Sequence, residues 1–217
     1  MKKSASAVSV IRGADGPTSV FLLKKNAKLT LRQKIQRTKN KIKRFYVGKT
    51  LSCESHGLDE VMEYIINRYG FVEVDKDAEE VAEEYQQMRA SFIIQYAPEL
   101  LGESIAYPKL KSELPEDLEV YIRQSEERMQ RAMEIPSTEF DIDFHKFKKS
   151  FDDINDNMNL VIEKKYAYIG GGAGGNKKVI KSFQRIYKDV YRYYGVTKED
   201  KISKSERYKD VVRALSQ

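Results

Sequence analysis

Apolar residues recur at alternating spacings of four and three along most of the chain, and this spacing places them on one face of an α-helix. The longest such run is Phe140, Phe144, Phe147, Phe151, Ile154, Met158 and Val161. Shorter runs predict helices over residues 30–46, 58–69, 81–96, 118–133, 177–194 and 205–215. We therefore expect a mainly α fold, a helical bundle-like domain of six or seven helices with a small N-terminal β-hairpin.

Turn-forming residues and prolines separate these runs. Gly70 closes the helix over 58–69, and a short strand is expected over 71–74. Pro98 and Pro136 each stop a helix, whereas Pro115 suits the first turn of one. Within the run 140–161 several residues are poor helix formers, so a break near Asn157 is the alternative to one long helix. These residues are Asp152, Asp153, Asn155, Asp156 and Asn157.

Glycine dominates residues 170–175, and a helix there would carry a large entropic cost. We expect a loop or hinge. Gly170, Gly172 and Gly175 also match the spacing G-x-G-x-x-G before a predicted helix, and Lys177 adds a positive charge. That arrangement is typical of a phosphate-binding loop, whereas the other interpretation is a flexible linker. A Walker loop is excluded because Asn176 stands where its lysine is required.

Charge is sharply segregated along the 217 residues, although the net charge is only +6. Residues 1–50 hold 14 Lys/Arg and one acid, residues 51–145 hold 8 against 23, and residues 146–217 hold 17 against 9. We expect one compact domain in three parts. These are a basic hairpin and amphipathic helix over 1–50, an acidic helical core over 51–169, and basic C-terminal helices over 176–217 after the Gly-rich hinge.

The basic helix over residues 30–46 is the main candidate for a binding site. Its candidate residues for an anionic partner are Lys28, Arg32, Lys34, Arg37, Lys39, Lys41, Lys43 and Arg44. No acid interrupts them, so they could neutralise phosphates of nucleic acid or meet an acidic protein surface. The alternative is that Leu31, Ile35 and Ile42 pack inside the chain and that the charges lie against its acidic middle.

The N-terminal segment joins two β-branched runs through a turn signal that includes Gly13, Asp15, Gly16, Pro17 and Thr18. With Ala14, these residues resemble a motif of the β subunit of sodium-translocating decarboxylases, which act on oxaloacetate, methylmalonyl-CoA or glutaconyl-CoA. The resemblance covers about a dozen residues. It implies a role for Asp15 in sodium handling and makes the chain a possible soluble relative or accessory of such a pump. Arg12 departs from the family's first glycine, and the other interpretation is a structural turn.

Other site classes have little support in the sequence. Cys53 is the only cysteine, and His56 and His145 are the only histidines, so no metal-ligand spacing is present. Cys53 and His56 are too close in sequence for the opposed geometry of a thiol and its base. No apolar run is long enough to cross a bilayer, and we expect a cytoplasmic chain that does not insert into membranes.

These observations favour a non-enzymatic interaction protein. We expect no catalytic residue, no metal and no cofactor. The expected partner is a protein with an acidic surface or a nucleic acid, held by the basic N-terminal region. Kinship with a sodium-translocating decarboxylase is the alternative.

Overall fold

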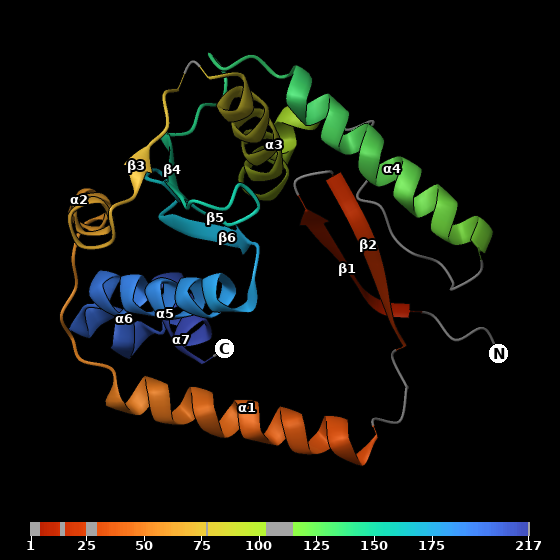
Figure 1. The fold of residues 1–217 in the computed structure, drawn as a ribbon. Helices are drawn as coiled ribbons and strands as arrows, with labels where there is room; N and C mark the ends of the chain where they lie inside the picture. The colour runs from red at the N-terminus through yellow and green to blue at the C-terminus, as the bar shows by residue number, and fades with distance from the viewer. Residues whose placement is uncertain (1–4, 14–15, 25–29, 77, 103–114, 217) are drawn as a thin grey trace. The chain divides into compact units, whose positions relative to one another are not determined.

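The computed structural model describes the backbone of residues 5–13, 16–24, 30–76, 78–102 and 115–216 (Figure 1). The helices are α1 Leu31–Thr50, α2 Leu58–Tyr69, α3 Glu79–Tyr96, η1 Pro98–Leu101 (a 3₁₀ helix), α4 Pro115–Glu134, α5 Lys177–Tyr194, α6 Lys198–Ser203 and α7 Glu206–Leu215. The strands are β1 Ala5–Gly13, β2 Gly16–Lys24, β3 Val72–Glu73, β4 Phe144–Ser150, β5 Asn157–Glu163 and β6 Tyr168–Gly174.

The chain forms two compact units that cut across the charge-based segments. One comprises residues 1–31 and 86–141, and the other comprises residues 32–85 and 142–217. Helix α3 contributes its first part to the second unit and the rest to the first.

In the first unit, β1 and β2 pair in antiparallel fashion, with Val10 opposite Val20 and Gly13 opposite Gly16. The helical part of this unit is organised by Arg89, which is 2% exposed. Its guanidinium donates to the backbone carbonyls of Phe140 (2.9 Å) and Ile135. Because a buried cation is costly unless its N–H groups are bonded, these contacts fix the chain after α4 against α3.

The second unit is built around a four-stranded antiparallel sheet in the order β3-β4-β5-β6. Phe147 on β4 lies opposite Leu160 on β5, and both side chains are fully buried on the face that α5 covers. The alternate β4 residues face the start of α3: Phe144 makes an edge-on ring contact with Tyr85. The sheet therefore has helical cover on both sides.

The long helix predicted over 140–161 is wrong, because this segment forms β4, a turn and β5. Both faces of the sheet are buried, so apolar residues need not alternate strictly along the strands and can mimic helical spacing. Ile154, which belongs to the predicted stripe, is 93% exposed in the turn. The poor helix formers around it supply that turn.

The predicted loop or hinge at the glycines is also wrong, because residues 168–174 form β6. A Cβ atom at Gly171 would lie 2.3 Å from the carbonyl oxygen of Asn159 on β5. Glycine is therefore used here to let two strands approach closely, which a larger residue would prevent.

The core of the second unit lies between the sheet and helices α2, α5 and α7. Helix α5 turns one apolar side toward it, formed by Val179, Phe183, Ile186, Val190 and Tyr194. The Tyr191 hydroxyl donates to the Ile169 carbonyl on β6 at 2.6 Å, which ties the helix to the sheet. Each buried aliphatic or aromatic side chain here contributes about 1.5–3 kcal/mol.

The mainly α bundle predicted from the sequence is therefore wrong as a fold class. A four-stranded antiparallel sheet, with β4, β5 and β6 from the C-terminal half and the short β3 from residues 72–73, holds the core of the second unit, and its strands are not those of the N-terminal segment. Residues 51–169 accordingly are not a helical core, since β3, β4 and β5 lie within them. The helices predicted over 58–69 and 177–194 are confirmed with the same bounds.

Candidate functional site

Helix α1 displays the predicted anion-binding residues. Apart from Lys28, which lies outside the described residues, they are all on this helix and all exposed: Arg32, Lys34, Arg37, Lys39, Lys41, Lys43 and Arg44. Within the second unit, the apolar stripe of the alternative interpretation is not packed into the core. Leu31 is 75% exposed, and Ile35 and Ile42 are exposed as well. Helix α1 thus offers charge and apolar surface together.

The last turn of α1 is fixed to the core of the second unit. Val47 is partly buried against that core and Leu51, just after the helix, is buried in it. A Cβ atom at Gly48 would lie 2.3 Å from the hydroxyl oxygen of Tyr208, so glycine allows a close approach to α7. The Lys201 ammonium donates to the Leu51 carbonyl at 2.7 Å. This anchor holds the helix, and the described side chains of residues 31–46 are exposed.

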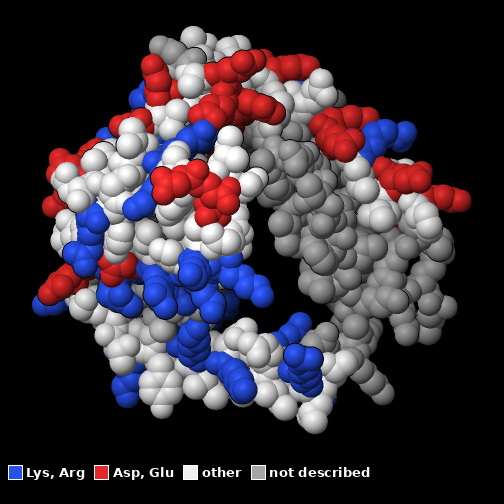
Figure 2. All heavy atoms as spheres, viewed as in Figure 1, with Lys and Arg blue, Asp and Glu red and all other residues white. Residues whose placement is uncertain are grey.

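A second basic surface follows α5, within residues 176–217 that were expected to form basic helices but were not predicted to form a binding surface. Its cations recur at spacings of three and four and lie within an arc of about 100° at 3.6 residues per turn. They are Lys177, Lys178, Lys181, Arg185, Lys188 and Arg192. This arc lies opposite the buried side of the helix. The same spacing rule that located the apolar face would have located it. Figure 2 shows Lys and Arg gathered over α5 and along α1.

A groove of about 540 Å³ runs beside this basic face of α5. Arg68 of α2 and Lys149 of β4 join Arg185, Lys188 and Arg192 in lining it. The carboxylate among the described lining residues is that of Asp189. Five cations against one carboxylate give the groove a positive potential, which attracts anionic groups.

Asp189 is held by neighbours and is not available as an acid or base. The hydroxyls of Tyr64 and Tyr69 donate to its Oδ2 at 2.5 and 2.6 Å, and Arg192 lies 3.3 Å from its Oδ1. Burial opposes ionisation of this carboxyl. The two hydroxyls and the cations Arg192 and Arg68 outweigh burial and hold the pKa of Asp189 below its ordinary value. The carboxylate therefore has a structural role in the wall of the groove, where it links Tyr64, Tyr69 and Arg192.

The glycines of the predicted phosphate loop do not form a loop whose backbone amides surround a phosphate site. Gly170 and Gly172 belong to β6, and only Gly175 lies in the connection to α5. At the start of α5 the Asn176 side chain already accepts from the amides of Lys178 and Val179. The Asp156 carboxylate accepts from the Asn176 amide at 2.9 Å. A carboxylate at this helix start competes with a phosphate, so these contacts weigh against the phosphate-binding hypothesis for Gly170, Gly172, Gly175 and Lys177.

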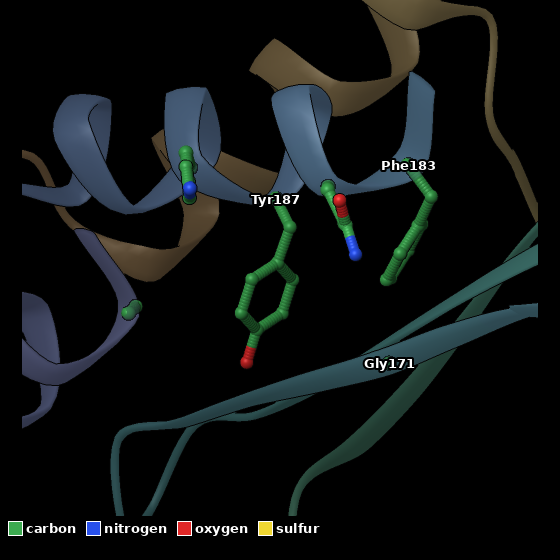
Figure 3. Close-up of a pocket in the computed structure, with 6 residues that line it drawn as sticks. Gly171, Phe183 and Tyr187 are labelled. Carbon is green, nitrogen blue, oxygen red and sulfur yellow. The ribbon is translucent and has the colours of Figure 1, made fainter. Parts of the chain in front are cut away.

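A small cavity of about 260 Å³ lies between α5, β6 and α7. Figure 3 shows Phe183 and Tyr187 pointing from α5 toward β6 beside Gly171. Burial raises the pKa of Tyr187, so its hydroxyl stays protonated and donates to the Ile169 carbonyl. The cavity is below the usual 300–1,000 Å³ of ligand pockets and is explained by packing.

The remaining sequence candidates divide between described and undescribed residues. The backbone of Gly13, Gly16, Pro17 and Thr18 belongs to β1 and β2, whereas Asp15 lies outside the described residues. Cys53 is exposed. His56 stacks on Tyr193 with ring centroids 3.8 Å apart, which gives this histidine a structural role.

The chain matches no protein-family model, no characterised protein and no solved structure. None of the described helices combines the length and the apolar character that crossing a membrane requires.

Proposed function

We propose that this chain is an interaction protein that binds an anionic macromolecule through α1. The observation that carries the proposal is the exposure of the described side chains of residues 31–46, where every charged residue is a lysine or arginine. A helix with no acid and seven described cations over four turns attracts polyanions strongly at low salt. The helix is already formed and anchored, which lowers the entropy lost on binding.

The test is salt-dependent retention on heparin. The test variant carries serine in place of Lys34, Arg37, Lys41 and Arg44. We expect this variant to elute from heparin at lower salt than the wild type. Serine also lowers helix propensity, so a matched variant carries serine at the uncharged Gln36, Thr38 and Asn40 instead. Equal retention of the wild type and the charge-removed variant would contradict the proposal that α1 is the anion-binding site.

The basic groove on α5 favours a second candidate function, nucleic-acid binding. The cations of α5 lie within one arc of the helix, and the exposed Ile180 lies outside that arc, as suits contacts with a phosphate backbone. Such contacts make the logarithm of the affinity fall linearly with the logarithm of the salt concentration, by about 0.9 per phosphate on duplex DNA.

This second function is tested on the α5 face alone. Replacing Lys181 and Arg185 by serine is expected to reduce the salt slope for duplex DNA by about 2, one unit per lost phosphate contact. The matched control replaces Lys76 and Lys198, which are exposed on other elements, and removes the same charge. If both double variants lower the slope equally, net charge and not the groove accounts for binding.

A further inference from the structure

The exposed apolar residues of α1 form a narrow seam. These are Leu31, Ile35, Ile42 and Phe45, and with the polar Thr38 between Ile35 and Ile42 the positions follow one another at spacings of four, three, four and three. This spacing averages 3.5 residues and is that of the a and d positions of a heptad repeat, along which two helices pack. Phe45 is 67% exposed and Ile42 is 52% exposed, so the seam faces solvent in this chain. Apolar surface displayed in this regular way is typical of a helix-binding face.

The residues that border the seam specify the charge of the partner. In this register Arg32 and Lys39 occupy e positions, and Lys34 and Lys41 occupy g positions. Opposite each of them a paired helix places its own e or g residue, and these contacts choose the partner and its orientation. The outward position far from the seam is held by the uncharged Asn40, to which Gln36 donates at 3.1 Å. Cations thus flank the seam on both sides.

Other occupants fit this pattern less well. A second copy of α1 would place lysine against arginine or lysine in either orientation, which repels it. A phosphate backbone would neutralise the cations but leave the apolar seam in water. A bilayer surface favours a broad apolar face, whereas this seam is narrow and is interrupted by Thr38. A partner helix with apolar residues at a and d would cover the apolar seam, and acidic residues at its e and g positions would pair with the flanking cations.

We propose that residues 31–46 of α1 form the basic half of a two-helix interface whose other half is an acidic amphipathic helix of a partner protein. This inference rests on the proposed function of α1 and names its partner. The partner helix carries apolar residues at a and d and Asp or Glu at e and g. Because α1 is anchored at Val47 and Leu51, the interface forms without rearrangement of the core.

The test uses a dye-labelled synthetic peptide of four heptads with leucine at a and d and glutamate at e and g. The control peptide has lysine in place of glutamate. We expect fluorescence anisotropy to show binding of the acidic peptide by the full chain and none of the basic peptide. Ile35→Ser with Ile42→Ser should weaken binding at least tenfold, because both isoleucines would be buried between the two helices. Gln36→Ser with Asn40→Ser, away from the seam, should leave it unchanged.

The outcomes separate this inference from the proposed function on which it rests. Serine at Ile35 and Ile42 leaves the charge of α1 intact, so heparin retention should persist while peptide binding falls. The inference is overturned if the acidic peptide fails to bind, or if it binds the serine variant as tightly as the wild type. It is also overturned if duplex DNA or phosphatidylglycerol vesicles bind α1 in a manner that depends on Ile35 and Ile42 while the peptide does not. Loss of heparin retention on removing the cations remains the separate test of the proposed function.

Discussion

Asp156 accepts hydrogen bonds from both amides of Asn176, the backbone N–H at 2.9 Å and the side-chain N–H at 2.6 Å. This pair orients the Asn176 side chain so that its oxygen caps the first turn of α5. Asn176→Ala should therefore lower the free energy of unfolding by about 1 kcal/mol, the usual contribution of a helix N-cap. Urea unfolding measures the change.

The control for this prediction is Lys178→Ala. Only the backbone amide of Lys178 takes part in the cap, so the substitution should change the free energy of unfolding by less than about 0.5 kcal/mol. Equal losses in the two variants would mean that the cap contributes nothing specific.

Gly195→Ala should be strongly destabilising. Gly195 has φ of 59°, and a Cβ atom there would lie 1.9 Å from the carbonyl oxygen of Glu54. The backbone strain alone costs about 1–3 kcal/mol, and the clash adds to it. Gly57→Ala is the matched control, because φ is −70° and its Cβ would meet only the Glu60 carboxylate at 3.6 Å. Thermal unfolding should show a large fall in Tm for the first variant and a small change for the second.

Asp189 should make stability depend on pH in the acid range. Its pKa is depressed in the folded state, so its contribution is present above the unfolded value of about 3.9 and is lost as pH falls through the folded value. Asp189→Asn should be less stable than the wild type at pH 7, and the difference should shrink below about pH 4. Urea unfolding of both proteins across this range checks the prediction, and a gap that stays constant into strong acid contradicts it.

One alanine-to-glycine change should stabilise the protein. Ala167 is exposed in the turn before β6 and has φ of 53°, a region that favours glycine. Ala167→Gly should raise the free energy of unfolding by up to about 1 kcal/mol. The same change at Ala82, exposed in α3, should lower it by about 1 kcal/mol because glycine disfavours a helix. Changes of the same sign would show that local backbone conformation does not govern either site.

Helix positions were predictable where one face is buried and the ends carry clear signals. Helix α2 begins after Gly57 and ends at Gly70, which has φ of 67°. Helix α5 combines a buried stripe with the Asn176 cap, and α7 begins at its Ser205 cap. In these cases periodicity and local backbone chemistry agree, so tertiary contacts did not have to decide the structure.

The sheet was not predictable in the same way. The side chains of Phe144 and Phe147 point to opposite faces of β4, and both are buried because helices cover both faces. Their spacing of three therefore resembles a helix. Gly170 to Gly174 lack β propensity altogether and form a strand only because β5 pairs with them. Both segments depend on pairing with the neighbouring strand of a hairpin and on the helices that cover the sheet, and the spacing of residues within one segment records neither.

The candidate site was partly predictable. Charge located the cations of α1, but exposure of its apolar stripe could only come from the structure. The groove beside α5 joins Arg68 and Lys149 to Arg185 from segments far apart in sequence, so no local pattern could assemble it.

The single-ended anchor of α1 has a consequence for its local stability. Residues 31–46 make hydrogen bonds within the helix. This part of α1 can unfold locally while the core that contains Leu51 stays folded. Their backbone amides should therefore exchange hydrogen for deuterium much faster than those of α5, which opens only with the core. A partner lying on the seam slows exchange in α1 and leaves α5 unchanged, so deuterium uptake along this one helix reports when it is occupied.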